Sequence, residues 1–199
     1  MKAFFSTLLF LILSLPVYGR ELPKTLLNLF KGVKTAEITF SQKTFVPVAG
    51  NEVTLYRGEI FYKRPLKFLW RYTWGSRMEI VSNGKFLETV FDDGSCQLTP
   101  LEGNLNMFPL LLLAESPEEF LKEFKVVSDE KREGVEVVTC VARGRDPFFR
   151  KFIFFLKGGR LEGLKAVQSD GTEETFVIEN LKLNTPVEDS LFKLRPCKE

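Results

Sequence analysis

The sequence contains no histidine, and this absence excludes much of the familiar chemistry of enzymes. Histidine is the commonest general base, the usual metal ligand and the partner of most catalytic serines and cysteines. A Gly-x-Ser-x-Gly nucleophile elbow is also missing. The two carboxylate pairs have structural explanations, because residues 92–95 have a turn composition and residues 116–119 that of a capped helix start. We therefore predict no enzymatic activity, no metal site and no cofactor.

Cysteine and one-sided charge are scarce as well. The three cysteines, Cys96, Cys140 and Cys197, are widely spaced and form no Cys-x-x-Cys pair, so they predict neither a metal cage nor a disulfide framework. A single disulfide is compatible with an oxidising compartment, but the spacing does not name the pair. The 28 Lys and Arg nearly balance the 26 Asp and Glu, without a long run of one sign. We therefore expect no nucleic-acid partner.

The chain has one long apolar run, at its N-terminus. Lys2 precedes the run from Ala3 to Leu15, and Val17-Tyr18-Gly19 suits a cleavage site before Arg20. The run is too short to span a bilayer comfortably, so residues 1–19 are interpreted as a secretory signal peptide and residues 20–199 as one exported domain. Bacterial lipoproteins carry an acylated cysteine at the position after cleavage. Because Arg20 stands there, we expect a mature chain without a lipid anchor.

Alternation of apolar and polar residues is the dominant pattern after the leader. Residues 22–30 and 105–124 have helical spacing. Strands are predicted near residues 35–46, 53–63, 67–74, 77–82, 85–91, 95–100, 125–129, 135–142, 148–157, 160–168 and 172–183. The short connections between them require antiparallel pairing. We predict a mainly β chain, with one large curved antiparallel sheet and helices against one face.

The segment from Gly58 to Trp74 is the most distinctive. Phe68, Trp70, Tyr72 and Trp74 stand at alternate positions, so a regular strand would place all of them on one face. Such a wall either fills a core or binds an apolar ligand. Residues 148–156 are apolar on both strand faces, and two short helical regions offer little to cover so many strands. This excess favours a lined cavity, with a fully packed interior as the alternative.

Several segments, taken in order, resemble one family, the periplasmic outer-membrane lipoprotein carrier proteins, LolA. They are Phe40-Ser41-Gln42-Lys43, the run from Gly58 to Pro65 with Phe68 and Trp70 beyond it, the run from Ile80 to Lys85, the run from Phe108 to Ala114, and the run from Leu191 to Pro196. The combination Gly-x-x-x-x-Lys-Arg-Pro-x-x-Phe-x-Trp is the most specific of these features.

This resemblance implies a single incomplete antiparallel β-barrel of about eleven strands with a helical lid, which holds acyl chains. The cargo would be acylated lipoproteins. An inner-membrane lipoprotein-releasing ABC transporter would supply them, and a LolB-like outer-membrane acceptor, or the outer membrane directly, would receive them from a monomeric periplasmic carrier. The candidate lipid-binding residues are Phe61, Phe68, Trp70, Tyr72 and Trp74; Arg64 would close the lid, and Met107, Phe108, Leu110 and Leu111 would belong to it.

Another function of the same fold stays open. A lipid-binding or lipid-sensing module, such as a LolB-like acceptor or an envelope-stress regulator, would show the same strand pattern. A LolB-like acceptor would carry an acylated cysteine at its mature N-terminus, and Arg20 opposes this interpretation.

Overall fold

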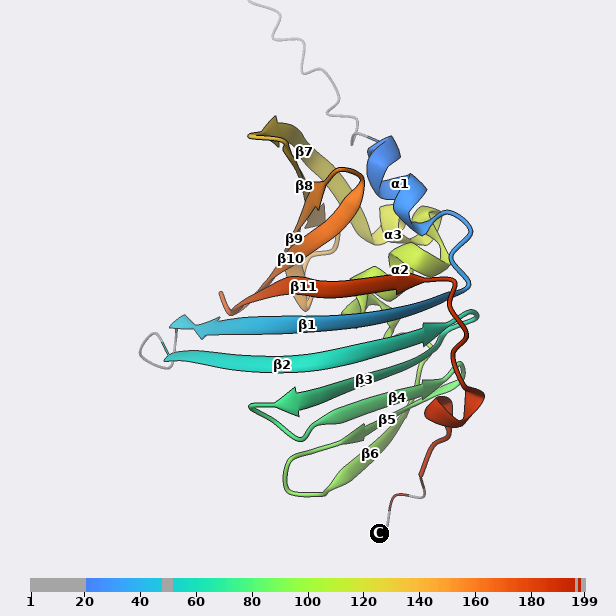
Figure 1. Ribbon diagram of the computed structural model, residues 1–199. Helices are drawn as coiled ribbons and strands as arrows, with labels where there is room; N and C mark the ends of the chain where they lie inside the picture. Colours follow the sequence, from blue (N-terminus) through green and yellow to red (C-terminus); the bar gives the residue numbers. More distant parts are fainter. Residues whose placement is uncertain (1–20, 48–51, 196, 198–199) are drawn as a thin grey trace, which may run out of the picture.

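The computed structural model describes residues 21–47, 52–195 and 197 (Figure 1). The segment interpreted as a signal peptide, residues 1–19, lies outside the described residues. Strands dominate the part that is described, as the alternating pattern predicts. Their bounds are β1 Thr35–Val46, β2 Glu52–Lys63, β3 Lys67–Trp74, β4 Glu79–Asn83, β5 Phe86–Val90, β6 Cys96–Pro100, β7 Phe124–Arg132, β8 Val135–Ala142, β9 Phe149–Lys157, β10 Arg160–Gln168 and β11 Glu173–Leu183.

All of these strands belong to one antiparallel sheet, in the order β6-β5-β4-β3-β2-β1-β11-β10-β9-β8-β7. The chain's two halves meet where β1 pairs with β11. β6 and β7 end this order without pairing with each other, so the described strands form an incomplete barrel. The predicted fold class is confirmed.

β7 is longer than the sequence pattern predicts. Its ladder with β8 continues to Arg132, which pairs with Val135. The last residues of β7 are charged and exposed, so apolar alternation stops before the hydrogen bonding does. An exposed hairpin of this kind leaves no hydrophobic signal.

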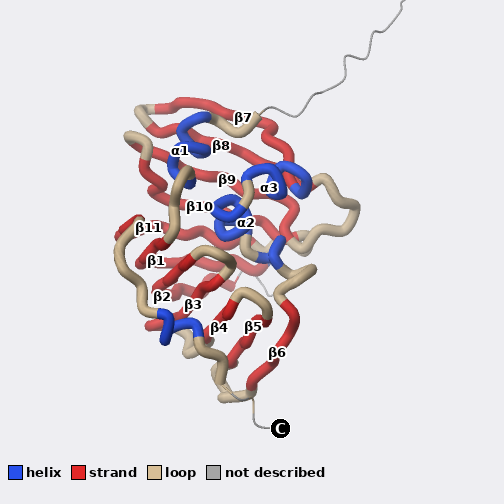
Figure 2. Tube along the Cα trace, turned by 90° about the vertical axis from the view of Figure 1, so that its right-hand side faces the viewer, coloured by secondary structure: helices blue, strands red, loops and turns tan. Residues whose placement is uncertain are grey.

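Three short helices lie in the concavity of the bent sheet (Figure 1). They are α1 Lys24–Phe30, α2 Pro109–Glu115 and α3 Pro117–Glu123, and a 3-10 turn, η2 Leu105–Met107, precedes α2. Figure 2 looks onto them from the open side. The predicted helix start is confirmed, because the Ser116 hydroxyl accepts a hydrogen bond from the Glu119 N–H at 3.2 Å and Pro117 opens α3.

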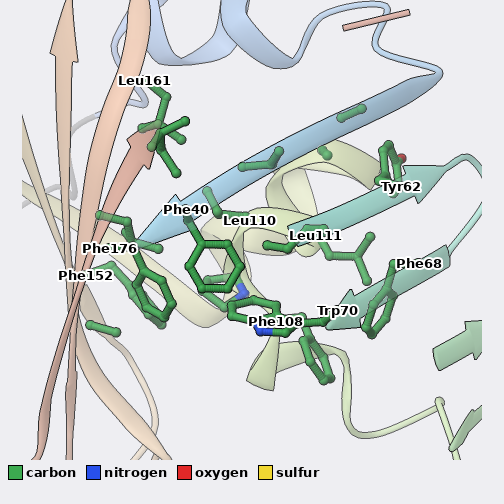
Figure 3. A pocket seen from close by; sticks show the side chains of 18 of the residues that line it. Phe40, Tyr62, Phe68, Trp70, Phe108, Leu110, Leu111, Phe152, Leu161 and Phe176 are labelled. Carbon is green, nitrogen blue, oxygen red and sulfur yellow. The ribbon is translucent and has the colours of Figure 1, made fainter. Parts of the chain in front are cut away.

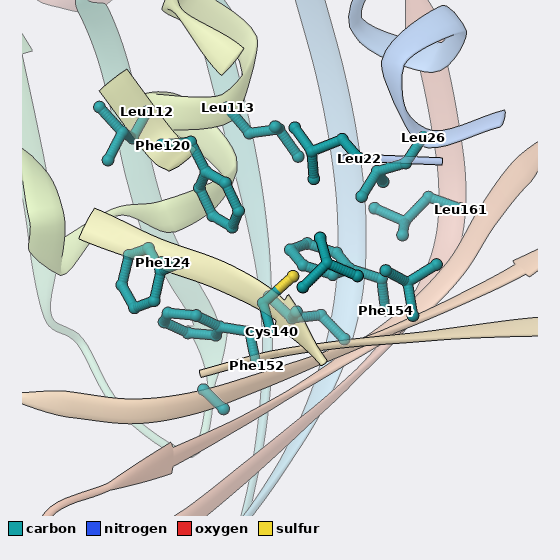
Figure 4. Close-up of a cluster of buried hydrophobic side chains, with 14 of the residues drawn as sticks. Leu22, Leu26, Leu112, Leu113, Phe120, Phe124, Cys140, Phe152, Phe154 and Leu161 are labelled. Carbon is teal, nitrogen blue, oxygen red and sulfur yellow. The ribbon is translucent and has the colours of Figure 1, made fainter. Parts of the chain in front are cut away.

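The main core lies between the helices and the strands β7 to β11 (Figure 4). Leu26 of α1 and Phe120 of α3 are fully buried in it, against Phe154 of β9 and its neighbours. Burying a side chain of this size stabilises the fold by roughly 1.5–3 kcal/mol. α1 and α3 are therefore anchored to the sheet.

A smaller core lies on the outer face of the sheet. There the 3-10 turn η3, Asp189–Phe192, and the chain that follows it cover β3 and β4. Phe192 packs against Leu69 and Val81, which point away from the helices. The tail of the chain thus holds the convex side of the first half of the sheet.

Candidate functional site

A cavity of about 250 Å³ lies between the concave face of the sheet and α2 (Figure 3). It is lined from β1, β2, β3, β4, β9, β10 and β11 on one side and from α1, η2 and α2 on the other. Nearly all lining side chains are aliphatic or aromatic, and among the described lining residues Glu174 is the one acidic or basic residue of the types Asp, Glu, Lys and Arg. The predicted excess of apolar lining over filler therefore corresponds to a cavity.

Three of the predicted aromatic residues lie on this wall. Phe68, Trp70 and Tyr72 all line the cavity from β3. The ring of Phe68 packs against Phe108 with 4.7 Å between centroids, and the ring of Trp70 meets Phe40 at 5.2 Å. Phe40 comes from β1, a strand that the periodicity of residues 58–74 does not reveal as a neighbour.

Trp74, which the alternation predicts on the same wall, is not there. The β2–β3 ladder shifts register between Arg57 and Gly58, so that Tyr72 pairs with Gly58 while Trp74 pairs with Arg57. The shift adds one residue to β3, and a single added residue reverses the direction of the next side chain. Trp74 is consequently 58% exposed and outside the cavity lining.

Phe61 also lies elsewhere. Its neighbours Ile60 and Tyr62 line the cavity, so the alternation of β2 turns Phe61 to the outer face. There it packs against the cluster of Leu69 and Phe192. Phe61, which was predicted to bind lipid, is therefore outside the cavity lining, and Tyr62 takes that place.

The four predicted lid residues all border the cavity. Met107 belongs to η2, Phe108 precedes α2, and Leu110 and Leu111 project from α2 into the space (Figure 3). The next two residues, 112 and 113, point the other way into the main core. α2 is thus shared between the cavity and the core.

Arg64 stands at the turn between β2 and β3 and contacts the end of α2. Its guanidinium donates hydrogen bonds to the main-chain carbonyls of Ala114 and, at 3.3 Å, of Glu115. The last carbonyls of a helix have no partner within the helix, and a guanidinium can satisfy two at once. The turn between the strands is in this way tied to the end of the helix.

The Glu115 side chain completes this contact. Its carboxylate accepts hydrogen bonds from the Tyr62 hydroxyl at 2.9 Å and from the Leu66 N–H, and lies 3.5 Å from the Arg64 Nε. Burial raises the pKa of Tyr62, so its hydroxyl stays a donor. Glu115 was not among the residues predicted from the sequence. An acidic residue at a helix C-terminus is unfavourable unless it is paired, and that could have indicated it.

The other end of the cavity is polar. The Tyr72 hydroxyl donates to the Gln42 Oε1 at 2.7 Å, and the Gln168 Nε2 donates to the Glu174 Oε1 at 2.7 Å. Burial raises the pKa of Glu174 above its ordinary value, and the Gln168 hydrogen bond acts against this rise. Burial also raises the pKa of Tyr72, and the nearby Glu174 raises it further. Gln42 belongs to the segment 40–43 that carries the resemblance, and Tyr72 was a predicted lipid-binding residue, whereas no sequence motif pointed to Gln168 or Glu174.

Metal clusters and membrane-spanning helices are both missing from the described residues. No group of three or more acidic, cysteine or histidine side chains is placed there to hold a metal ion. None of the helices in that part of the chain is both long and apolar enough to cross a membrane.

The open sheet, the apolar cavity and the helical cover define a class of incomplete β-barrels built around an internal apolar site. Comparison with known sequences gives the family. The chain belongs to the outer membrane lipoprotein carrier protein LolA family, whose model matches residues 31–195. The resemblance drawn from the sequence is confirmed.

The relatives are distant in sequence. An outer-membrane lipoprotein carrier protein of Pseudomonas putida (strain W619) is 27% identical over 177 residues, which cover 88% of this chain and 82% of the relative. Among solved structures, an uncharacterized conserved protein from Thermus thermophilus has a TM-score of 0.51 at 9% identity, over 86% of this chain and 92% of that one. A LolA superfamily protein from Nitrosomonas europaea has a TM-score of 0.47 at 12% identity, over 85% and 94% of the two chains.

Proposed function

We propose that this protein binds the acyl chains of lipoproteins in its cavity and carries them through the periplasm. The observation that supports the proposal is an apolar cavity closed by a helix that Arg64 ties to the sheet. Each methylene taken out of water contributes roughly 0.8 kcal/mol, so exposed acyl chains would be very costly. A carrier has to enclose them and still be able to let them go.

The cavity is too small for such a cargo as it stands. Its volume of about 250 Å³ lies below the roughly 300–1,000 Å³ of pockets that hold drug-sized ligands. Leu110 and Leu111 occupy space that acyl chains would need. We infer that this is the closed form, and that cargo binding displaces α2.

The contact between Arg64 and α2 also accounts for release of the cargo. A hydrogen bond from a charged donor is worth about 1.5–3 kcal/mol, enough to set the balance between two lid positions that differ by a few kcal/mol. The Arg64 contact with α2 would favour the closed form and thereby help to expel the cargo. An inner-membrane ABC transporter would load the open form, and a LolB-like acceptor or the outer membrane would receive the cargo.

The two tryptophans of β3 provide a matched test. Trp70 lines the cavity and Trp74 lies outside it, so Trp70→Glu and Trp74→Glu introduce the same charge at two positions of one strand. A triacylated lipoprotein, transferred from detergent by dilution, should co-elute with wild type and with Trp74→Glu. Binding to Trp70→Glu should fall by about tenfold or more, because an unpaired carboxylate is costly against apolar surface.

Circular dichroism establishes that both variants are folded. Equal binding by a folded Trp70→Glu would rule the cavity out as the acyl site. Binding by wild type without transfer to acceptor membranes would favour the lipid-sensing module over the carrier.

A further inference from the structure

The indole N–H of Trp70 is a buried donor without an acceptor. Its nitrogen is shielded from water and makes no hydrogen bond to any described residue. It lies near the Tyr72 hydroxyl and lowers the pKa of that group, yet the two do not reach the geometry of a hydrogen bond. Buried polar groups nearly always have a partner, so an unpartnered donor in the cavity lining is suited to an acceptor on a ligand.

The surrounding side chains do not supply that partner. The rings of Phe40 and Phe176 meet Trp70 edge to face, at 5.2 and 5.6 Å, and an aromatic face is at best a weak acceptor. Neither the Gln42 oxygen, which accepts from Tyr72, nor the Tyr72 hydroxyl itself lies in position to accept a hydrogen bond from the indole. A strong acceptor would have to come from the ligand.

The unpartnered group of the lining is a donor. Gln42 and Gln168 hold the polar side chains of the lining in place, since the Gln42 Oε1 accepts from Tyr72 and the Gln168 Nε2 donates to Glu174, but neither glutamine is among the described lining residues. The Trp70 N–H belongs to the lining and has no partner among the residues that the structure describes. An unpaired N–H suits an oxygen that accepts hydrogen bonds.

The charge of the site restricts the chemical class of the ligand further. No lysine or arginine is among the described residues that line the cavity, and Glu174 stands at its polar end. A phosphate or a free carboxylate would meet no cation from that lining and would be repelled by Glu174 when that group is ionised. The acceptor must be neutral and must be attached to long apolar chains.

We propose that the Trp70 N–H and the polar groups beside it form a subsite for the carbonyl oxygen of a fatty acyl ester or amide. This inference rests on the proposed function, since it assigns the polar atoms of the same apolar cargo. The acyl carbonyl is neutral, accepts hydrogen bonds only, and continues directly into methylenes that the aromatic wall can cover. The carrier would thereby select acylated glycerol or acylated amine over plain hydrocarbon and over anionic phospholipid.

The test compares an ester with an ether of the same length. Dioctanoylglycerol and dioctylglycerol ether are each titrated against the neutral dye N-phenyl-1-naphthylamine bound to the full mature protein. One neutral hydrogen bond is worth about 0.5–1.5 kcal/mol, or roughly two- to twelvefold in affinity. Wild type should bind the ester about fivefold more tightly than the ether. Trp70→Phe, which keeps an aromatic ring but removes the N–H, should prefer the ester less than about twofold.

The matched control is Trp74→Phe, which should keep the full preference because Trp74 lies outside the cavity. A third ligand, N-octyl octanamide, distinguishes the two sources of the carbonyl. A loss confined to the ester assigns the subsite to the diacylglyceryl group, and a loss shared by ester and amide extends it to the N-acyl group. Either outcome supports the subsite.

A second readout requires no variant. The chain has two tryptophans, so the ¹H–¹⁵N spectrum contains two indole N–H signals. The Trp70 signal should move downfield with the ester and not with the ether, while the Trp74 signal stays in place.

An undiminished ester preference in Trp70→Phe, or an unmoved Trp70 signal in wild type saturated with ester, would overturn the subsite. Equal binding of ester and ether by wild type would overturn the subsite, but it would not contradict the apolar cavity as the acyl-binding site. Wild type that binds neither would overturn the proposed function as well.

Discussion

At the scale of single residues, Arg64 makes the most specific contact with α2. An arginine is suited to it because a planar guanidinium offers several fixed donors and stays charged. Arg64 uses them on the carbonyls of Ala114 and Glu115 and on the Glu115 carboxylate. No other residue type would satisfy the helix end and the acid in the same geometry.

We expect Arg64→Leu to fold and to accept lipoprotein but to hand it on poorly. Losing a contact of about 1.5–3 kcal/mol shifts the balance of the lid toward the open form by roughly 10- to 100-fold. Arg64→Lys should restore transfer only in part, because an ammonium lacks the planar fork. The measurement is the transfer of preloaded lipoprotein to acceptor membranes, with the exposed Arg150→Leu as control. Wild-type transfer rates in a folded Arg64→Leu variant would show that Arg64 does not control transfer.

Gly58 is required by a close approach of neighbouring atoms. A Cβ built on it would lie 2.6 Å from the Arg71 carbonyl oxygen and 2.6 Å from the Phe40 ring. Gly58→Ala should therefore lower the free energy of unfolding by about 1–3 kcal/mol through overpacking. Gly144→Ala, at a position with no atoms within 4 Å, is the matched control and should be nearly neutral. Chemical denaturation measures both variants, and equal midpoints would contradict the packing described around Phe40.

Glu174 predicts a dependence of stability on pH. Burial raises its pKa in the folded protein, so its protonated form is favoured there. The stability that this carboxyl contributes is fully present below the pKa of an unfolded glutamate, about 4.3, and is lost as the pH rises through the folded value. Glu174→Gln should raise the melting temperature at about pH 8, and this gain should vanish near pH 4. The exposed Glu162→Gln should show no such trend. A gain in melting temperature that stays constant with pH would contradict the raised pKa of Glu174.

At the scale of secondary-structure elements, we expect α2 to be the part that moves. Leu110 and Leu111 border the cavity, and α2 is joined to the sheet through the Arg64 turn and not by a strand ladder. Each helix also buries a leucine fully in the main core, Leu26 in α1 and Leu113 in α2. α2 nevertheless gives four residues to the cavity lining, 109–111 and 114, whereas α1 gives two, Leu29 and Phe30. Local opening is expected where few interactions must break.

Hydrogen exchange tests this difference. On binding of lipoprotein, amides of residues 107–114 should exchange faster, and those of residues 24–30 should change less. The β1–β11 ladder, which joins the two halves of the sheet, should stay protected. Loss of protection in that ladder before any change in α2 would mean that the sheet opens and not the lid.

At the scale of the whole molecule, the C-terminal tail closes the outer face of the sheet. Cys197 forms a disulfide with Cys96 of β6, across a sequence separation of 101 residues. Just before it, the Arg195 main-chain N–H donates to the carboxylate of Glu88, which is fully buried. The edge strand β6 is thereby fastened to the tail.

We expect Cys96→Ser to lower the free energy of unfolding by about 2–4 kcal/mol, since a disulfide restricts the unfolded chain more as the loop lengthens. Thiol titration checks that the disulfide is present. The remaining Cys140 is buried, which raises its pKa to about 12, so the native protein should show no reactive thiol. In denaturant, one thiol per chain should react without reductant and all three of the chain's cysteines with it. Three reactive thiols without reductant would contradict the disulfide.

The strands and their turns could be predicted because they depend on local order. Alternation with period two and turn residues such as Gly158-Gly159 act over a few positions, so all the strand segments could be located from the pattern. The resemblance carried by Gly58 to Trp70 likewise gave the family, since it rests on the residues themselves. The cavity's apolar character followed from the number of aromatic side chains.

What could not be predicted depends on contacts between residues far apart in the chain. Trp74 leaves the wall because the ladder between β2 and β3 slips by one residue, and a slip of register has no signal in one strand alone. Cys197 finds Cys96 only after the tail has crossed the convex face. Phe40 and Glu174 reach the cavity because β1 and β11 pair across most of the chain. Local sequence determines which face a side chain takes within a regular strand, whereas register and pairing determine what it meets there.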